Sequence, residues 1–121
     1  MKRIVLIITA FFGFSLFFSC THDPVLPDQQ VSYANDIYPI ILSGCNHSGC
    51  HDTLASNETS PLISYDDVVH YVTPGKPKSS KIYTSVTGTG EEFMPKAPYP
   101  ALNDRQIKLL YIWIAQGAKN N

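Results

Sequence analysis

The sequence lacks any run of basic residues long enough to bind nucleic acid: nine Lys and Arg residues are balanced by ten Asp and Glu residues. Without a basic patch or a basic amphipathic helix, nothing in the chain is suited to a phosphate backbone. The main apolar run, residues 4–18, is shorter than the roughly 18–20 residues that a membrane-spanning helix needs. Internal repeats and heptads are absent too, which favours one small domain.

The short apolar run is instead typical of an export signal. Lys2 and Arg3 precede it, and the small residue Ser19 and then Cys20 follow it. This order resembles a lipobox, in which the cysteine is acylated and becomes the new N-terminus, and it predicts a lipoprotein signal peptide over residues 1–19. Acyl chains on Cys20 would anchor the protein to a membrane without crossing it, in the cell envelope as a periplasmic or surface-exposed lipoprotein. The alternatives are an ordinary signal peptide or a short anchor helix.

Cysteine is scarce, and its odd count needs an explanation in an exported chain. The three cysteines are Cys20, Cys45 and Cys50, and lipidation of the first leaves the other two as a pair. Removal of the signal peptide leaves 102 residues with seven basic and ten acidic side chains, a net charge of about −3. We divide this mature chain into a proline-bearing tether over residues 20–31 and a domain over residues 32–118.

The apolar spacing of the domain predicts an all-α fold with its two better helices at the ends. Ser32 can cap the first helix, Pro39 would bend or restart it, and Gly44 would end it. The sequence Asn103-Asp104-Arg105-Gln106 predicts a capping box for the last helix, and Gly117 is suited to its C-terminal end.

Shorter helices and loops are expected between the two terminal helices. One helix is expected to begin at a capping box formed by Ser64 and Asp67, and another at Ser79 or Ser80. Residues 91–101 contain several prolines and predict an ordered loop. A domain of this size with so much loop has a small core, so an additional staple is expected.

The residues with the clearest chemistry form the heptapeptide Cys-Asn-His-Ser-Gly-Cys-His over residues 45–51. Two cysteines with a histidine directly after the second is the arrangement that attaches haem covalently, usually as Cys-x-x-Cys-His. Here four residues separate the cysteines, and Gly49 lets the longer spacer bulge outward. The thiols of Cys45 and Cys50 would then reach two vinyl groups, while His51 would reach the iron from one face.

Methionine is equally scarce, and Met94 is the one methionine that remains beyond the signal peptide. It lies in the tripeptide of residues 93–95, where no helical stripe needs filling, and this favours an iron ligand over a core residue. A neutral thioether opposite His51 would raise the potential of the iron. His70, on a short helix, is the alternative distal ligand, and His47 is interpreted as a surface residue of the spacer.

With these features the chain resembles a small bacterial class I-type cytochrome c over residues 32–118. The segments that carry the resemblance are Tyr33–Ile41, Cys45…Cys50-His51, Phe93-Met94-Pro95 and Ile107–Ala118, with Pro74–Tyr83 as further support. The resemblance implies a cytochrome c-like fold, in which the N- and C-terminal helices and short helices and loops surround one haem.

The same resemblance implies one covalent haem c on Cys45 and Cys50, with His51 as the proximal and Met94 as the distal iron ligand. It further implies transfer of single electrons to redox partner proteins of unknown identity. No catalysis is implied, because both axial positions of the iron are filled; the chain could also serve as a sensor or as a subunit of a larger oxidoreductase.

Two other interpretations of the cysteine pair lead to a different class of function. Cys45 and Cys50 would form a disulfide in an oxidising compartment, or would bind zinc together with His47 and His51. Either staple would make the chain a lipoprotein that acts as a binding or assembly module. The disulfide leaves His51 and Met94 unexplained, and adjacent ligands at positions 50 and 51 are awkward for one tetrahedral ion.

Overall fold

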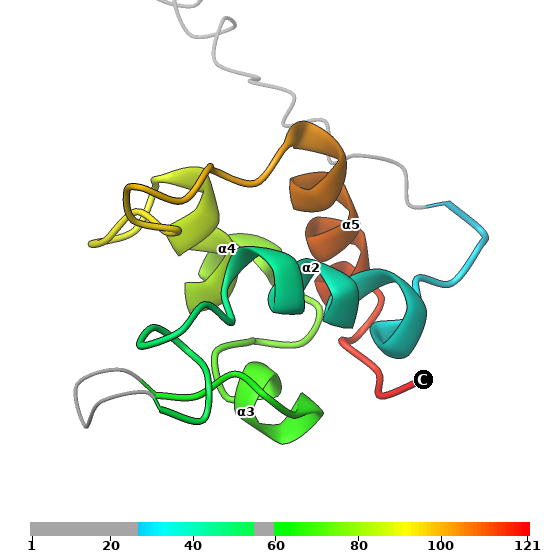
Figure 1. Ribbon diagram of the computed structural model, residues 1–121. Helices are drawn as coiled ribbons and strands as arrows, with labels where there is room; N and C mark the ends of the chain where they lie inside the picture. The colour runs from blue at the N-terminus through cyan, green and yellow to red at the C-terminus, as the bar shows by residue number, and fades with distance from the viewer. Residues whose placement is uncertain (1–26, 55–59) are drawn as a thin grey trace, which may run out of the picture.

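The computed structural model describes residues 27–54 and 60–121 (Figure 1). Within these ranges the chain forms helices and loops without a strand, which confirms the all-α class. The elements in order are η1 (Tyr33–Ile37), α2 (Tyr38–Gly44), α3 (Tyr65–Val69), η2 (Pro77–Ser79), α4 (Lys81–Thr87) and α5 (Asp104–Ala115). The predicted signal peptide and Cys20 lie outside the described residues. Among the helices that are described, none has the length and apolar character to cross a membrane.

The first helix is divided in two at the place where Pro39 predicts a restart. Ser32 caps it, because its Oγ accepts a hydrogen bond from the Asn35 backbone N–H at 3.2 Å. Asp36 completes a reciprocal cap, since its Oδ2 accepts from the Ser32 backbone N–H at 2.8 Å. The π-helical turn η1 then passes directly into α2, which carries Pro39 in its first turn, where a missing N–H costs nothing.

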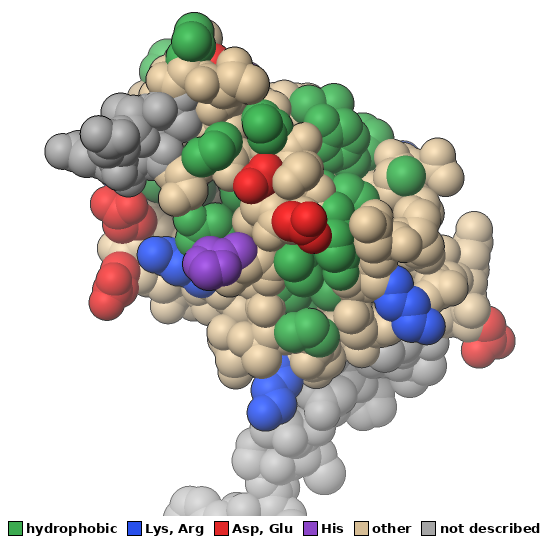
Figure 2. All heavy atoms as spheres, turned by 90° about the horizontal axis from the view of Figure 1, so that it is seen from below, with side chains coloured by type: hydrophobic (Ala, Val, Ile, Leu, Met, Phe, Trp, Pro, Cys, Tyr) green, Lys and Arg blue, Asp and Glu red, His purple; other side chains and the backbone are tan. Residues whose placement is uncertain are grey.

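The short helix α3 begins at the predicted capping box. Ser64 Oγ accepts from the Asp67 backbone N–H at 3.2 Å, and Asp67 Oδ2 accepts from the Ser64 backbone N–H at 2.9 Å and from Ser64 Oγ at 2.7 Å. These hydrogen bonds stabilise a helix of barely more than one turn, which has little intrinsic stability of its own. Seen from below, the surface of the molecule shows acidic side chains and a histidine among hydrophobic side chains (Figure 2).

The cap also predicts an acid-dependent loss of stability. The hydrogen bond from the Ser64 side chain holds the pKa of Asp67 below its ordinary value of 3.8. Because the pKa is lower in the folded chain, this stabilisation is fully present above the unfolded-state pKa and is lost as the pH falls through the folded-state pKa. We expect the Asp67→Asn variant to be less stable than the wild type above about pH 5, and the difference to shrink at lower pH.

Denaturant unfolding across this pH range measures the effect. Asp66→Asn is the matched control, because it removes a charge from the same helical turn but leaves the capping box intact. If the free energy of unfolding of Asp67→Asn were lower than that of the wild type by the same amount at every pH, this result would contradict the assigned role of the carboxylate.

The last helix, α5, is the longest of the described helices and is capped as the sequence predicts. Asn103 Oδ1 accepts from the Gln106 backbone N–H at 3.0 Å, and Gln106 Oε1 accepts from the Asn103 backbone N–H at 2.9 Å. At the other end Gly117 follows the helix with a φ of 100°, a left-handed conformation that glycine adopts readily.

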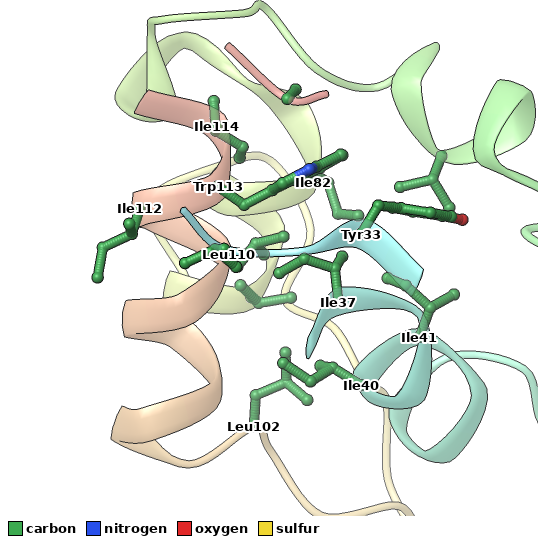
Figure 3. Close-up of a cluster of buried hydrophobic side chains, with 14 of the residues drawn as sticks. Tyr33, Ile37, Ile40, Ile41, Ile82, Leu102, Leu110, Ile112, Trp113 and Ile114 are labelled. Atoms are coloured by element: carbon green, nitrogen blue, oxygen red, sulfur yellow. The ribbon is translucent and has the colours of Figure 1, made fainter. Parts of the chain in front are cut away.

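The core lies where α5 crosses the first helix, with Trp113 at its centre (Figure 3). Trp113 is 1% exposed, and its indole Nε1 donates to the Lys119 carbonyl oxygen at 2.9 Å. Its ring lies 5.6 Å from the Tyr33 ring and 6.5 Å from the Tyr65 ring, measured between centroids. The fully buried aliphatic side chains around this cluster are Ile37, Ile41, Val68, Leu110 and Ile114. Residues from both ends of the domain thus form a single core.

Ser80 is the buried polar residue of this core and does not cap α4 in the predicted way. Its side chain makes no capping bond to α4. Instead Ser80 Oγ accepts from the Thr73 backbone N–H at 2.9 Å and lies 3.0 Å from the Lys76 carbonyl oxygen, to which it can donate. A buried hydroxyl needs partners, and the turn before η2 provides them.

The packed part of the chain extends into the segment that the proline pattern assigns to the tether. Val31 is buried, and its backbone N–H donates to Gln116 Oε1 at 2.9 Å. Gln116 Nε2 donates to the carbonyl oxygens of Pro27, at 3.4 Å, and Gln29, at 3.1 Å. The side chain of Gln116 therefore attaches residues 27–31 to the C-terminal end of α5.

Candidate functional site

The first cysteine of the heptapeptide lies immediately after α2, held against the core. Cys45 caps the helix, with its backbone N–H donating to the Ile41 carbonyl oxygen at 2.9 Å. Gly44 allows this close packing: a Cβ added there would lie 2.8 Å from Leu102 Cδ2. The C-terminal end of α2 is thus fixed against the segment that leads into α5.

The four-residue spacer forms a turn that projects from the end of α2. The Cys50 backbone N–H donates to the His47 carbonyl oxygen at 2.9 Å, which closes the turn. Gly49 adopts a φ of 76° with no atom close to where its Cβ would lie, and its N–H donates to Asp52 Oδ1 at 3.2 Å. The longer spacing is accommodated by this exposed turn, and both cysteines stay at its ends.

Both thiols of the heptapeptide are free, so no disulfide joins Cys45 to Cys50 in this structure. Cys45 packs against the hydrophobic core, and burial raises the pKa of its thiol to about 11. A thiol with such a pKa is protonated at neutral pH, and it is a slower nucleophile than a thiolate.

The buried thiol leads to a prediction for the unloaded chain. In a Cys20→Ser/Cys50→Ser variant we expect alkylation of Cys45 by iodoacetamide to be slow at neutral pH. Its rate should rise about tenfold per pH unit until the pH approaches the pKa near 11, because only the thiolate reacts. The same measurement in denaturant is the control, in which the rate should level off at a pH nearer 8.5. Equal pH profiles in the two conditions would contradict burial of this thiol.

His51 is held in one orientation and one tautomer by the segment that follows the spacer. Its Nδ1 lies 2.6 Å from the Ser60 carbonyl oxygen. A carbonyl oxygen only accepts hydrogen bonds, so Nδ1 is the donor, and in the neutral imidazole Nε2 then keeps its lone pair. The backbone adds a second restraint, because the Leu62 N–H donates to the His51 carbonyl oxygen at 2.8 Å. This is the hydrogen-bond arrangement that orients a metal-binding histidine.

Met94 lies in the loop between α4 and α5 and is half-buried. Its backbone N–H donates to the Ser85 carbonyl oxygen at 3.0 Å, which fixes the start of the loop on α4. The neighbouring Phe93 side chain is 49% exposed, and Pro95 is buried. Residues 91–101 contain no helix or strand, as the sequence predicts.

A ring stack connects the spacer to the loop that carries Met94. The rings of His47 and Tyr99 lie 3.7 Å apart between centroids and 5° from parallel. His47 was interpreted from the sequence as a surface residue, but it is half-buried through this contact. The sequence gives no signal for the stack, because its two members lie far apart in the chain and neither belongs to a periodic pattern.

The remaining histidine of the domain, His70, lies in a different environment. Together with Ser60, Pro61, Asp66, Asp67 and Tyr71 it lines an open pocket of about 320 Å³. Its ring contacts Tyr71 edge-on, with centroids 5.4 Å apart. Throughout residues 27–54 and 60–121, no three His, Cys, Asp or Glu side chains converge into a group that could hold a metal ion, and this includes the ligands of the zinc alternative.

Four large hydrophobic side chains are exposed in the described part of the chain, and three of them lie close in sequence to the candidate residues. They are Leu42, Leu54, Ile63 and Phe93, and the most exposed is Leu54, at 74%. Leu42 lies three positions before Cys45, Leu54 three positions after His51, and Phe93 next to Met94.

Comparisons of the chain with protein-family models, with curated proteins and with solved structures found no match.

Proposed function

We propose that this protein is a membrane-tethered, mono-haem c-type cytochrome that carries single electrons. The observation that carries the proposal is the state of His51, which directly follows a free cysteine. His51 Nδ1–H donates a hydrogen bond to the Ser60 carbonyl oxygen, with 2.6 Å between nitrogen and oxygen, so in the neutral imidazole Nε2 presents a lone pair in a fixed direction. When bound, the haem would supply an iron centre that alternates between two oxidation states.

The two thiols are suited to permanent attachment of such a group. Each S–H would add across one vinyl group, forming a C–S bond and a C–H bond, and nothing would leave. Cys45 and Cys50 form no disulfide with each other, and the turn between them is exposed at Ser48 and Gly49.

The exposed hydrophobic side chains also favour a large apolar group at this site. The side chain of Leu54 is 74% exposed and that of Phe93 is 49% exposed. An isolated exposed hydrophobic side chain is normal on a protein surface and carries no argument by itself. Here both lie within three positions of a proposed iron ligand. A haem held between His51 and Met94 would cover apolar surface of this kind.

The second axial ligand assigned to Met94 makes the protein an electron carrier and not an enzyme. Two protein ligands leave no open position on the iron for a substrate, and a histidine–methionine pair favours a high potential. The arrangement of the terminal helices supports a cytochrome c-like fold, because η1 and α5 meet at the contact of Tyr33 with Trp113 (Figure 3).

A lipid on Cys20 would place this carrier at a membrane surface within the cell envelope, where its redox partners would be other proteins. The mature chain carries no basic region for nucleic acid. Cys20 precedes the described residues, so this part of the proposal rests on the lipobox-like sequence alone.

The direct test is expression of the full chain with a cytochrome c maturation system that accepts long spacers. We expect haem staining after denaturing electrophoresis and a pyridine haemochrome spectrum with one haem per chain. Cys50→Ser and Cys45→Ser should each leave a single thioether and shift that spectrum, whereas His70→Ala should leave attachment unchanged. Protein without covalent haem that contains stoichiometric zinc, or a Cys45–Cys50 disulfide, would replace the proposal with a stapled binding or assembly module.

A further inference from the structure

The stack of His47 on Tyr99 is the one parallel ring pair among the described aromatic contacts, all others being tilted or edge-on. Its centroid distance of 3.7 Å is van der Waals contact over the ring faces. Both residues are half-buried, so the contact removes apolar ring surface from water on both sides. A contact of this kind between two irregular loops restricts both of them.

Each ring is fixed by its backbone to a different part of the candidate site. His47 lies between the two cysteines, and its carbonyl oxygen accepts the hydrogen bond from Cys50 that closes the spacer turn. Tyr99 follows a turn in which its N–H donates to the Lys96 carbonyl oxygen at 3.1 Å. The other end of this loop is held where the Met94 N–H binds Ser85. The stack therefore holds the part of the Met94 loop around Tyr99 against the spacer.

We propose that His47 is a positioning residue that holds the Met94 loop in place through its stack on Tyr99. This inference rests on the proposed function, since it assigns a role in keeping Met94 at the iron. It also gives the four-residue spacer a purpose: the turn projects His47 from the end of α2 towards the second loop. A shorter spacer would have fewer positions from which a side chain could make this contact.

The holoprotein offers a direct test through competition between Met94 and added imidazole for the oxidised iron. If release of Met94 requires the stack to break, loss of the stack weakens the methionine-bound state and raises the apparent affinity for imidazole by the same factor. The free energy of an aromatic pair of this kind corresponds to a factor of about two to ten in an equilibrium constant, here the apparent affinity for imidazole. We expect this increase for His47→Ala and for Tyr99→Ala, and no further increase in the double variant.

Conservative variants separate the stack from a general effect on folding. His47→Phe and Tyr99→Phe keep two aromatic rings and should retain close to wild-type imidazole affinity. Lys96→Ala changes an exposed side chain of the same loop without touching the stack and serves as a comparison for loop disturbance. Each variant is also checked for helical content and for covalent haem.

The possible outcomes distinguish this inference from the proposed function. Wild-type protein without covalent haem would overturn both together. Haem-loaded wild type in which His47→Ala binds imidazole no more tightly would overturn the positioning role alone. Additive effects of His47→Ala and Tyr99→Ala would do the same, because two residues that act through one contact cannot contribute independently.

Discussion

Replacement of Met94 by alanine is expected to leave the haem covalently attached but to lower its reduction potential and change the spectrum of the oxidised protein. In the proposed cytochrome, attachment would depend on Cys45 and Cys50, whereas a distal thioether from Met94 would stabilise the reduced iron. We expect a decrease on the order of 0.1 V, within the roughly 0.8 V range over which axial ligands set haem potentials. Potentiometric titration and the oxidised absorption spectrum measure both effects.

His70→Ala is the matched experiment, because His70 is the other candidate for the distal position. It lies in the pocket beside α3, and its removal should change neither the spectrum nor the potential. If His70→Ala altered the spectrum while Met94→Ala did not, the distal ligand would be reassigned from the loop to α3.

Replacement of Trp113 by alanine is expected to cost about 3–5 kcal/mol in the free energy of unfolding, the usual cost of truncating a large buried aromatic side chain. The indole is 1% exposed, contacts the rings of Tyr33 and Tyr65, and donates to the Lys119 carbonyl oxygen. Single domains have a total stability of about 5–15 kcal/mol, so this loss would be between about a fifth and all of it. Denaturant unfolding of the chain without haem measures the effect directly.

Two variants on the same helix bracket this prediction. Lys108→Ala alters an exposed position of α5 and should change the stability by no more than about 0.5 kcal/mol. Trp113→Phe keeps an aromatic ring but loses the bond to Lys119, and should fall between the other two. A cost below about 1 kcal/mol for Trp113→Ala would show that the core does not depend on this residue.

The features that could be predicted from the sequence are those that depend on near neighbours. The caps at Ser32, Ser64 and Asn103 each join residues only a few positions apart, so their spacing is visible in the chain itself. Pro39 and Gly44 act on the backbone at their own positions, which explains why the division and the end of the first helix were predicted correctly.

The features that could not be predicted join distant segments or involve the backbone alone. His51 binds the backbone carbonyl of Ser60, and because every residue has such a carbonyl, the residue type does not reveal the partner. Ser79 or Ser80 is expected to cap α4, and Ser80 does precede its first residue, but its side chain binds the turn at Thr73 and not the helix. The stack of His47 on Tyr99 depends on how two loops meet, which local patterns do not encode.

The hydrogen bonds from Gln116 to Pro27 and Gln29 set a limit on how far the domain can move from a lipid anchor. Only residues 21–26 separate Cys20 from the first attached residue, a span of at most about 25 Å at 3.3–3.6 Å per residue. A protein acylated at Cys20 would therefore search for its partners by diffusion in two dimensions, at the high local concentration that a short link provides. Partners whose redox centres lie far above the bilayer would be out of its range.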